Sequence, residues 1–236
     1  MEYVKKIYNT NQLTNGGPLL DQLTNRLQHT LGVKHLLLVN NGTTALQIAY
    51  HIKNLQYKRV ITTPYTFAAT STALTWQGAK IKLANIDPST WNICSEAVKN
   101  IVEKEQADAI IAVNLFGVPC DLKALDQIAK KNDIPLIYDS AHAFLSEYRG
   151  DSIYNYGDIH CISFHATKLF HCVEGGALIF NNESEYRLAK KLINFGIDEN
   201  GLIDHAGING KLSEFHAAMG LCVLDELPSL IYERKN

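Results

Sequence analysis

No excess of charge of either sign marks this chain of 236 residues. Its 22 lysine and arginine residues nearly balance its 24 aspartate and glutamate residues, and the formal net charge is −2. No long run of one sign occurs. Surfaces that bind nucleic acid or anionic lipid are usually strongly basic. We therefore expect neither nucleic acid nor a membrane among the partners of this protein.

Long apolar runs and paired cysteines are also missing. No stretch approaches the roughly 18 apolar residues that would indicate a membrane span, and the first residues, MEYVKKIYNTNQL, are too polar for a secretory signal. The five cysteines are odd in number and include no CxxC pair. This pattern favours reduced thiols over a disulfide framework. The sequence therefore predicts a cytoplasmic protein.

The chain does contain a regular alternation of short apolar runs with segments of helical periodicity. Seven runs are predicted to be strands: 35–39, 59–62, 80–84, 108–113, 134–139, 160–164 and 177–180. Four segments between them are predicted to be helices: 43–52, 66–77, 95–104 and 122–131. Such alternation predicts an α/β fold of three layers, α/β/α, with a mostly parallel central sheet. Ligands of such sheets bind beyond the carboxyl ends of the strands.

No repeat, low-complexity tract or Pro/Gly-rich linker divides the sequence. From about residue 183 the pattern turns helical, and it is still helical in the last residues, LPSLIYERKN. A helix that stops without a capping residue indicates a truncated chain.

Two of the loops after predicted strands contain groups that suit a planar, anionic ligand. In the first, Asn41 and Gly42 lead into a helix that starts near Thr43. The free amides and hydroxyls there suit a phosphate, although an ordinary helix cap explains the stretch equally well. In the second, Phe67 starts a helix, where its ring either stacks on a ligand or belongs to the core.

Two later loops carry charged groups. Asp139 ends a strand, where its carboxylate either faces the ligand crevice or caps the next segment. Ser163 ends another strand, and Lys168 follows it in SFHATKLFHCVEGGALIF. A lysine near apolar groups becomes a nucleophilic amine able to form a Schiff base, whereas most lysines are simply solvated. The Gly-Gly pair of EGGA indicates that backbone passes close to another group, which favours the catalytic interpretation.

Together these features match one cofactor, pyridoxal 5′-phosphate (PLP). Its phosphate needs a helix N-terminus, its pyridine ring a stacking face, its ring nitrogen an anion and its aldehyde an amine. None of these features is specific by itself. The prediction depends on their occurring together, in this order, at the ends of predicted strands.

The sequence resembles the DegT/DnrJ/EryC1/StrS family of sugar aminotransferases, which have the type I aminotransferase fold. The resemblance runs from LTNGGPLLDQLTNRLQHTLGVKHLLLVNNGTTAL through TPYTFAAT and FGVPCDLKALDQIAKKNDIPLIYDSAHAF to GINGKLSEFHAAMGL. The block FHATK…EGGA is its most specific part. It implies that residues 1–236 are a PLP-binding large domain, truncated at both ends and without the small C-terminal domain.

The resemblance also implies a role for each matched residue. Lys168 forms the internal aldimine and Asp139 pairs with the pyridine nitrogen, so these two are the expected catalytic residues. Phe67 stacks on the ring, and His142 gives it a supporting contact. Three residues hold the phosphate: Gly42, Thr43 and Ser163. Asn209 reaches the phosphate of the neighbouring subunit, which places the site at the interface of a homodimer.

The implied reaction is transamination of a nucleotide-linked keto-sugar with glutamate as the amino donor. Lys168 moves the proton between the substrate carbon and the cofactor, and relatives with histidine in its place are dehydratases. FHATK with EGGA resembles enzymes of dTDP- or UDP-linked 4-keto-6-deoxy sugars, for surface polysaccharides or deoxyaminosugars. The GKN…GDGGA form of 3-keto enzymes is less similar, and a 3-keto substrate stays an alternative.

Other interpretations remain open. Four potential metal ligands lie within fifteen residues: His160, His165, His171 and Glu174. Alternation along a strand would send them in different directions, and no HExxH spacing occurs, so no metal is predicted. A desulfurase would need a reactive cysteine, and neither Cys172 nor Cys222 has an activating context. A truncated chain also fits a catalytically incomplete PLP-binding fragment or an interaction module.

Overall fold

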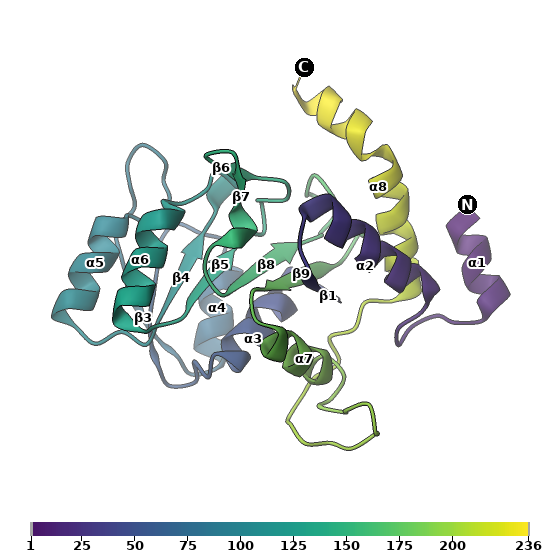
Figure 1. Ribbon diagram of the computed structural model, residues 1–236, viewed down its shortest axis with the longest axis horizontal. Helices are drawn as coiled ribbons and strands as arrows, with labels where there is room; N and C mark the ends of the chain where they lie inside the picture. Colours follow the sequence, from purple (N-terminus) through teal and green to yellow (C-terminus); the bar gives the residue numbers. More distant parts are fainter. Residues whose placement is uncertain (1, 236) are drawn as a thin grey trace.

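A twisted seven-stranded sheet forms the centre of the computed structural model, which describes residues 2–235 (Figure 1). The strand order is β1-β9-β8-β5-β4-β2-β3. The strands are β1 (His35–Val39), β2 (Arg59–Thr62), β3 (Lys80–Leu83), β4 (Ala109–Val113), β5 (Leu136–Asp139), β8 (Ile159–Ser163) and β9 (Gly176–Phe180). Only β9 runs antiparallel to its neighbours, β1 and β8. The predicted mostly parallel sheet is confirmed.

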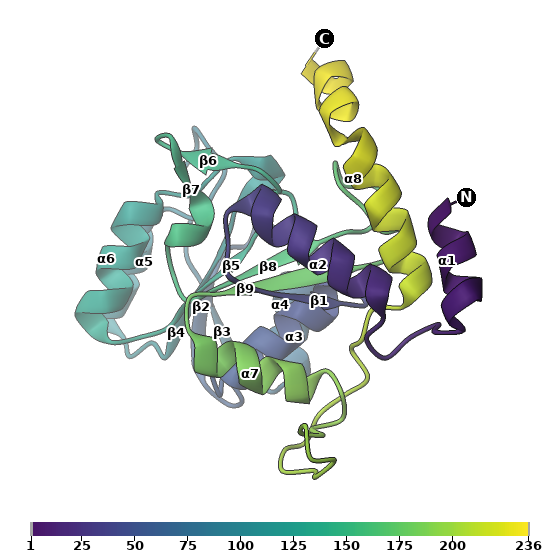
Figure 2. The same cartoon turned by 45° about the vertical axis from the view of Figure 1, so that its right-hand side comes forward.

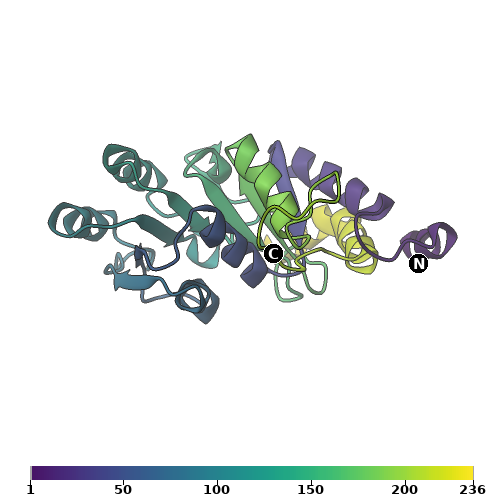
Figure 3. The same cartoon turned by 90° about the horizontal axis from the view of Figure 1, so that it is seen from below.

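Helices flank this sheet along its length (Figure 3). They are α1 (Glu2–Thr10), α2 (Pro18–Leu31), α3 (Gly42–Ile52), α4 (Ala68–Trp76), α5 (Ser95–Lys104), α6 (Leu122–Asn132), α7 (Glu183–Leu192) and α8 (Glu214–Lys235). A short hairpin, β6 (Glu147–Tyr148) and β7 (Asp151–Ser152), lies outside the sheet. Helix α8 packs against both α1 and α2, and its last turns project from the body (Figure 2). No helix of residues 2–235 is long and apolar enough to span a bilayer.

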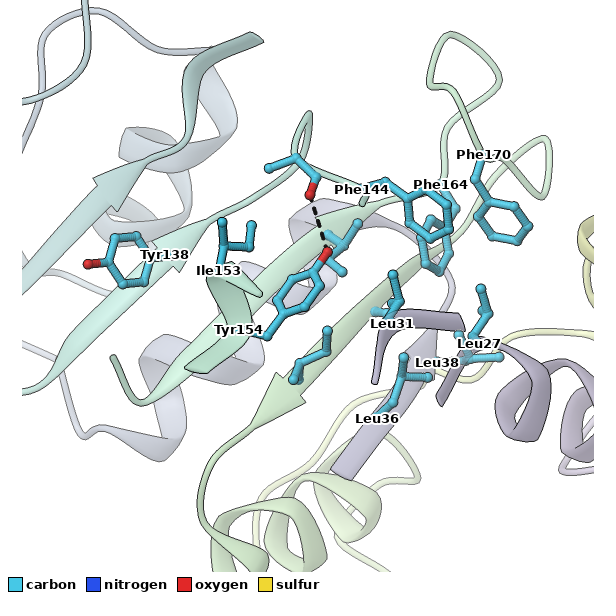
Figure 4. Packing of buried hydrophobic residues seen from close by; sticks show 14 of the residues in the cluster. Leu27, Leu31, Leu36, Leu38, Tyr138, Phe144, Ile153, Tyr154, Phe164 and Phe170 are labelled. Carbon is cyan, nitrogen blue, oxygen red and sulfur yellow. Dashed lines mark hydrogen bonds between the residues drawn. The ribbon is translucent and has the colours of Figure 1, made fainter. Parts of the chain in front are cut away.

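Alternation of side chains along the strands divides the apolar residues between two layers. On β1, Leu36 and Leu38 face the core that α2, α5, α6 and α8 cover, while Leu37 and Val39 face α3, α4 and α7. Aromatic rings fill much of the first core (Figure 4): Tyr138, Phe144, Tyr154, Phe164 and Phe170. Both faces of the sheet are therefore covered, as an α/β/α arrangement requires.

The seven predicted strands and four predicted helices are all present, with ends displaced by two residues at most. Continuous helix from residue 183 was expected, and this prediction is wrong for residues 193–213. That segment is a loop closed by isolated bridges between Asn194 and Asn209 and between Ile197 and Ile203. Four glycines interrupt it: Gly196, Gly201, Gly207 and Gly210. Glycine disfavours helix because its backbone loses the most freedom on ordering.

Candidate functional site

A cavity of about 340 Å³ lies at the carboxyl ends of β4, β5 and β8. Seven of the eight predicted site residues line it: Gly42, Thr43, Phe67, Asp139, His142, Ser163 and Lys168. Residues that are up to 126 positions apart in the sequence therefore meet at one place. The cavity lies beyond the carboxyl ends of parallel strands, where ligands of such sheets usually bind.

The N-terminus of α3 forms one wall of the cavity. Asn41 caps this helix, and its side chain accepts a hydrogen bond from the amide of Thr44 (2.7 Å). Among residues 2–235, the amides of Gly42 and Thr43 meet no acceptor. Free amides at the positive end of a helix dipole form an anion site. The stretch thus both caps a helix and fits a phosphate.

Gly176 explains how the start of α3 comes so close to the sheet. A Cβ atom at Gly176, the first residue of β9, would lie 2.7 Å from the carbonyl carbon and oxygen of Asn41. A Cβ atom at Gly42 would lie 3.0 Å from the Cβ of Ser163. The prediction that backbone passes close to the Gly-Gly pair is confirmed, and the neighbouring group is the start of α3.

Replacing Gly176 with alanine is expected to destabilise the protein by about 2 kcal/mol, because backbone atoms of Asn41 must move. Unfolding in denaturant measures the loss. Gly201→Ala is the control, since nothing lies within 4 Å of a Cβ there. It should lose only about 1 kcal/mol, the cost of its left-handed backbone. Equal losses in the two variants would contradict the close approach.

Asp139 ends β5 and is buried. Its carboxylate accepts hydrogen bonds from the Thr70 hydroxyl (2.6 Å) and the Ala141 amide (3.1 Å), so it also stabilises the turn after the strand. Burial raises the pKa of Asp139 above its ordinary value, while these hydrogen bonds and the nearby His142 and Lys168 oppose the rise. It forms no salt bridge within residues 2–235. A buried carboxylate without a cation fits a protonated ring nitrogen as its counter-ion.

Lys168 lies in the loop between β8 and β9 and lines the cavity. Partial burial lowers the pKa of its amine, and the charge of Asp139 acts in the opposite direction. A lowered pKa leaves a larger fraction of neutral amine, which is the nucleophilic form. The structure thus places a partly buried amine in the wall of the cavity.

The loop that carries Lys168 continues the β8–β9 hairpin beyond the sheet. The amide of Ala166 donates to the carbonyl of Val173 (2.8 Å), and the amide of Cys172 donates to the carbonyl of Phe164 (2.9 Å). Val173 has a φ of +69°. Branched residues rarely adopt this left-handed conformation, and such strain is common in segments that hold functional groups.

Val173→Asn is expected to stabilise the protein by up to about 1 kcal/mol, because asparagine tolerates left-handed backbone better than valine. Val173 is exposed, so little buried apolar surface is lost. Thermal unfolding measures the gain. Val118→Asn is the matched control, since Val118 is exposed to a similar degree but has an ordinary φ of −80°. A gain in both variants, or in neither, would contradict the assignment of strain.

Two aromatic groups complete the cavity. Phe67 is the N-cap of α4 and is 77% exposed, so it is not a core residue and can stack on a planar ligand. His142 stacks on Phe116, with ring centroids 5.9 Å apart and planes 18° from parallel. Burial and the charge of Lys168 lower the pKa of His142. Both effects favour the neutral form of its imidazole.

Among the polar residues that sequence reasoning missed, two form hydrogen bonds with Asp139. Thr70, on α4, donates to Asp139, and its hydroxyl lies 2.7 Å from that of Thr66. Asn114 lines the cavity and is fully buried. Its backbone amide donates a hydrogen bond to the backbone carbonyl of Asp139 (2.9 Å). The sequence could have indicated Asn114, because it is a polar residue directly after the predicted strand 108–113. No comparable signal marks Thr70, which lies inside a helix.

Asn209 lies apart from these residues and does not line the cavity. It belongs to the loop between α7 and α8, where its carbonyl accepts a hydrogen bond from the side chain of Asn40 (3.3 Å). Its expected role at the phosphate of a neighbouring subunit stays a prediction.

The histidines that were considered as metal ligands are dispersed. His160 is buried and hydrogen-bonded to Ser140 (2.9 Å) and to the carbonyl of Tyr156 (2.8 Å), and burial lowers its pKa to about 4. His165 and Glu174 approach each other to 3.6 Å at the cavity. Within the described residues, no three potential ligands are arranged to hold a metal ion.

The cysteines are all free thiols. Burial raises the pKa of Cys172 to about 12, so this thiol is not activated as a nucleophile. Cys222 is only partly buried and lies on α8. The geometry gives neither cysteine the environment that a desulfurase requires.

Comparisons with known proteins agree with this geometry. The model of the DegT/DnrJ/EryC1/StrS aminotransferase family matches residues 1–236. The chain is 39% identical over 234 residues to a dTDP-4-amino-4,6-dideoxy-D-glucose transaminase of Shigella dysenteriae, covering 99% of this chain and 63% of that protein. It is 34% identical over 230 residues to a UDP-4-amino-4,6-dideoxy-N-acetyl-β-L-altrosamine transaminase of Campylobacter jejuni, covering 95% and 61%.

A solved structure described as DesI in the presence of its TDP-sugar product superposes with a TM-score of 0.90 at 36% identity. The match covers 97% of this chain and 58% of that one. The chain therefore spans about three fifths of the length of the relatives that it matches.

Proposed function

Because the chain belongs to the DegT/DnrJ/EryC1/StrS aminotransferase family, we propose that its protein transfers an amino group to a nucleotide-linked keto-sugar. PLP is the cofactor that membership of this family implies. When bound, it supplies an aldehyde carbon that accepts the amino group from the donor and later gives it up to the acceptor, and a ring that withdraws electrons from the reacting carbon. One observation carries the proposal: an amine, a buried unpaired carboxylate and an open helix N-terminus meet in one cavity.

The residues of the cavity fit this cofactor. The amides of Gly42 and Thr43 lack an acceptor and would bind its phosphate, together with the hydroxyl of Ser163. The carboxylate of Asp139 lacks a cation and would hold the proton on the ring nitrogen. The exposed ring of Phe67 would cover one face of the pyridine ring.

Lys168 would act twice. Its Nζ would first bind the cofactor covalently, for which the neutral amine favoured by partial burial is required. Once displaced by the amino donor, the same Nζ would move a proton from the donor carbon to the cofactor, and in the second half of the reaction from the cofactor to the sugar carbon. Asp139 would stay ionised throughout and balance the positive ring nitrogen.

The substrate that we propose is a dTDP- or UDP-linked 4-keto-6-deoxyhexose, with glutamate as the donor. Both curated relatives are named for a 4-amino-4,6-dideoxy sugar, which favours a 4-keto over a 3-keto acceptor. Such products would serve surface polysaccharides or deoxyaminosugars. The free thiols favour a reducing compartment such as the cytoplasm. The proposal includes a homodimer with shared sites, in which Asn209 would reach the phosphate in the neighbouring subunit.

An amino-transfer assay tests the proposal. Protein loaded with PLP is incubated with glutamate and, separately, with dTDP- and UDP-linked 4-keto-6-deoxy sugars and a 3-keto isomer. We expect 2-oxoglutarate and an amino sugar from a 4-keto substrate, both detected by mass spectrometry. Amination of the 3-keto isomer alone would contradict the substrate assignment. Cofactor binding without any transfer would favour the alternative of a PLP-binding fragment.

A further inference from the structure

Two large aromatic residues near the cavity are exposed and have left-handed backbone. Trp91 has a φ of +61° and is 50% exposed, and Phe116 has a φ of +52° and is 66% exposed. Bulky residues enter this region rarely and at an energetic cost, and such outliers cluster at binding sites. Core packing explains neither ring, because neither is buried.

One buried side chain fixes the backbone at both rings. Asn92 directly follows Trp91 in the loop after β3, and its carboxamide oxygen accepts a hydrogen bond from the amide of Leu115 (3.0 Å). Its carboxamide nitrogen donates to two carbonyls farther along that second loop, at 3.0 and 3.2 Å. Leu115 directly precedes Phe116. The loops after β3 and β4 are therefore tied together at the residues beside the strained positions.

Phe116 contacts the wall of the cavity, and Trp91 is connected to it through Tyr65. Phe116 stacks on His142, which lines the cavity, and Leu115 lines it too. Trp91 lies edge-on to Tyr65, with ring centroids 5.6 Å apart and planes at 88°. Tyr65 is itself exposed and directly precedes two further lining residues. Tyr65, Trp91 and Phe116 together form what we call the aromatic rim.

A nucleotide-linked sugar is longer than this cavity can hold. Pockets that enclose drug-sized ligands measure about 300–1,000 Å³, and this cavity, of about 340 Å³, must take the cofactor and the reacting sugar. The nucleoside must therefore lie outside, beside the cavity. Nucleobases are planar and stack on aromatic side chains with little dependence on which base is present.

We propose that the aromatic rim binds the nucleobase of the substrate, an inference that rests on the proposed function. Stacking on Trp91 and Phe116 would orient the base, while the diphosphate leads the sugar into the cavity. At both positions a left-handed backbone occurs together with an exposed ring. We infer that this backbone conformation keeps the two rings accessible to the base. The rim would accept dTDP- and UDP-linked substrates with similar affinity, because a stacking face does not read the base edge.

Tryptophan fluorescence tests the rim directly, because the chain contains only two tryptophans. Trp76→Phe removes the tryptophan at the end of α4, so that Trp91 is the one tryptophan left to fluoresce. Titration with thymidine diphosphate or uridine diphosphate is expected to quench Trp91 with similar dissociation constants. Inorganic pyrophosphate should not quench it. In Trp91→Phe protein, the emission of Trp76 should not respond to either nucleotide.

Phe116→Asn, in the Trp76→Phe background, removes the second ring while preserving a residue that tolerates left-handed backbone. The dissociation constant for thymidine diphosphate is expected to rise at least about fivefold. Thermal stability should not fall, and PLP should still bind. Tyr57→Asn is the matched control, since Tyr57 has a φ of +61°, is 72% exposed and lies before the amino end of β2, whereas the cavity is at the carboxyl ends of the strands. It should leave nucleotide affinity unchanged.

The inference is overturned if nucleotides leave Trp91 emission unchanged, or if Phe116→Asn binds thymidine diphosphate as tightly as its parent. It is also overturned if the Trp91 or Phe116 variants dissociate a dimer in size-exclusion chromatography at unchanged nucleotide affinity, because the rim would then be a subunit contact. Failure of the proposed function would look different: PLP would not bind, while nucleotides still quenched Trp91.

Discussion

Lys168→Ala protein is expected to bind PLP without a covalent bond and to transfer amino groups at least about a thousandfold more slowly. The side chain supplies both the amine that holds the cofactor and the base that moves the proton, so no other group replaces it. Amino-transfer assays on protein saturated with PLP measure the loss. Lys99→Ala, on the outer surface of α5, is the control and should keep full activity.

Lys168→Arg tests whether the positive charge of this residue or its nucleophilic amine is required. Arginine keeps the positive charge near Asp139 but stays protonated at all relevant pH values, so it cannot act as a nucleophile. We expect it to be as inactive as Lys168→Ala. Activity within about tenfold of the unmodified protein, or about 1.4 kcal/mol in barrier height, would contradict a role for the Lys168 amine in the reaction.

The same amine predicts how cofactor capture depends on pH. Because burial lowers the pKa of Lys168, the fraction of neutral amine increases at a lower pH than for an ordinary lysine. Covalent capture of PLP, followed by absorbance, should therefore reach its maximal rate below the ordinary lysine pKa of about 10.4.

In the absence of cofactor, Asp139→Asn protein is expected to be more stable than its parent. It is also expected to bind PLP poorly and to transfer amino groups at least about a hundredfold more slowly. The amide replaces a buried charge and can still accept a hydrogen bond from Thr70 or Ala141. It cannot balance the charge of a protonated ring nitrogen. Urea unfolding, PLP titration and amino-transfer assays measure the three effects.

The sign of the pH effect follows from the raised pKa. The folded state binds the Asp139 proton more tightly than the unfolded state does. The stability of cofactor-free protein therefore falls as pH rises from the unfolded pKa through the folded one. Asp139→Asn removes this fall, so the two proteins should differ most above that interval.

Asp151→Asn, an exposed residue of β7, is the control and should change neither stability nor binding. Asp139→Asn protein that was less stable than its parent and bound PLP equally well would show that the carboxylate is structural rather than a partner of the ring nitrogen.

Much of the fold could be predicted because its signals are local. Short apolar strands bounded by helical segments identify a parallel sheet, and the carboxyl ends of strands identify where Asp139 and Lys168 meet. The direction of β9 carried no such signal, since a fully buried strand has the same apolar pattern in either direction. Residues 193–213 form a loop rather than the expected helix because four glycines disfavour helix in this segment.

The site was predicted less completely than the fold for a physical reason. Asp139 and Ser163 end a strand, and Gly42 and Lys168 follow one, so their positions could be inferred from the sheet. Thr70 acts from within a helix, and its contact with Asp139 depends on how α4 packs. The tie that Asn92 makes between two loops depends on their approach in space. Contacts of these two kinds produce no pattern of apolar and polar residues by which a single sequence could predict them.

Mass spectrometry of the borohydride-reduced protein tests the central claim most directly. The chain is incubated with PLP, reduced, digested and searched for the added mass of the cofactor. We predict that the mass lies on the peptide containing Lys168 and is lost in Lys168→Ala, together with the visible absorbance band. A cofactor mass on another lysine, or none while PLP is in excess, would contradict the account.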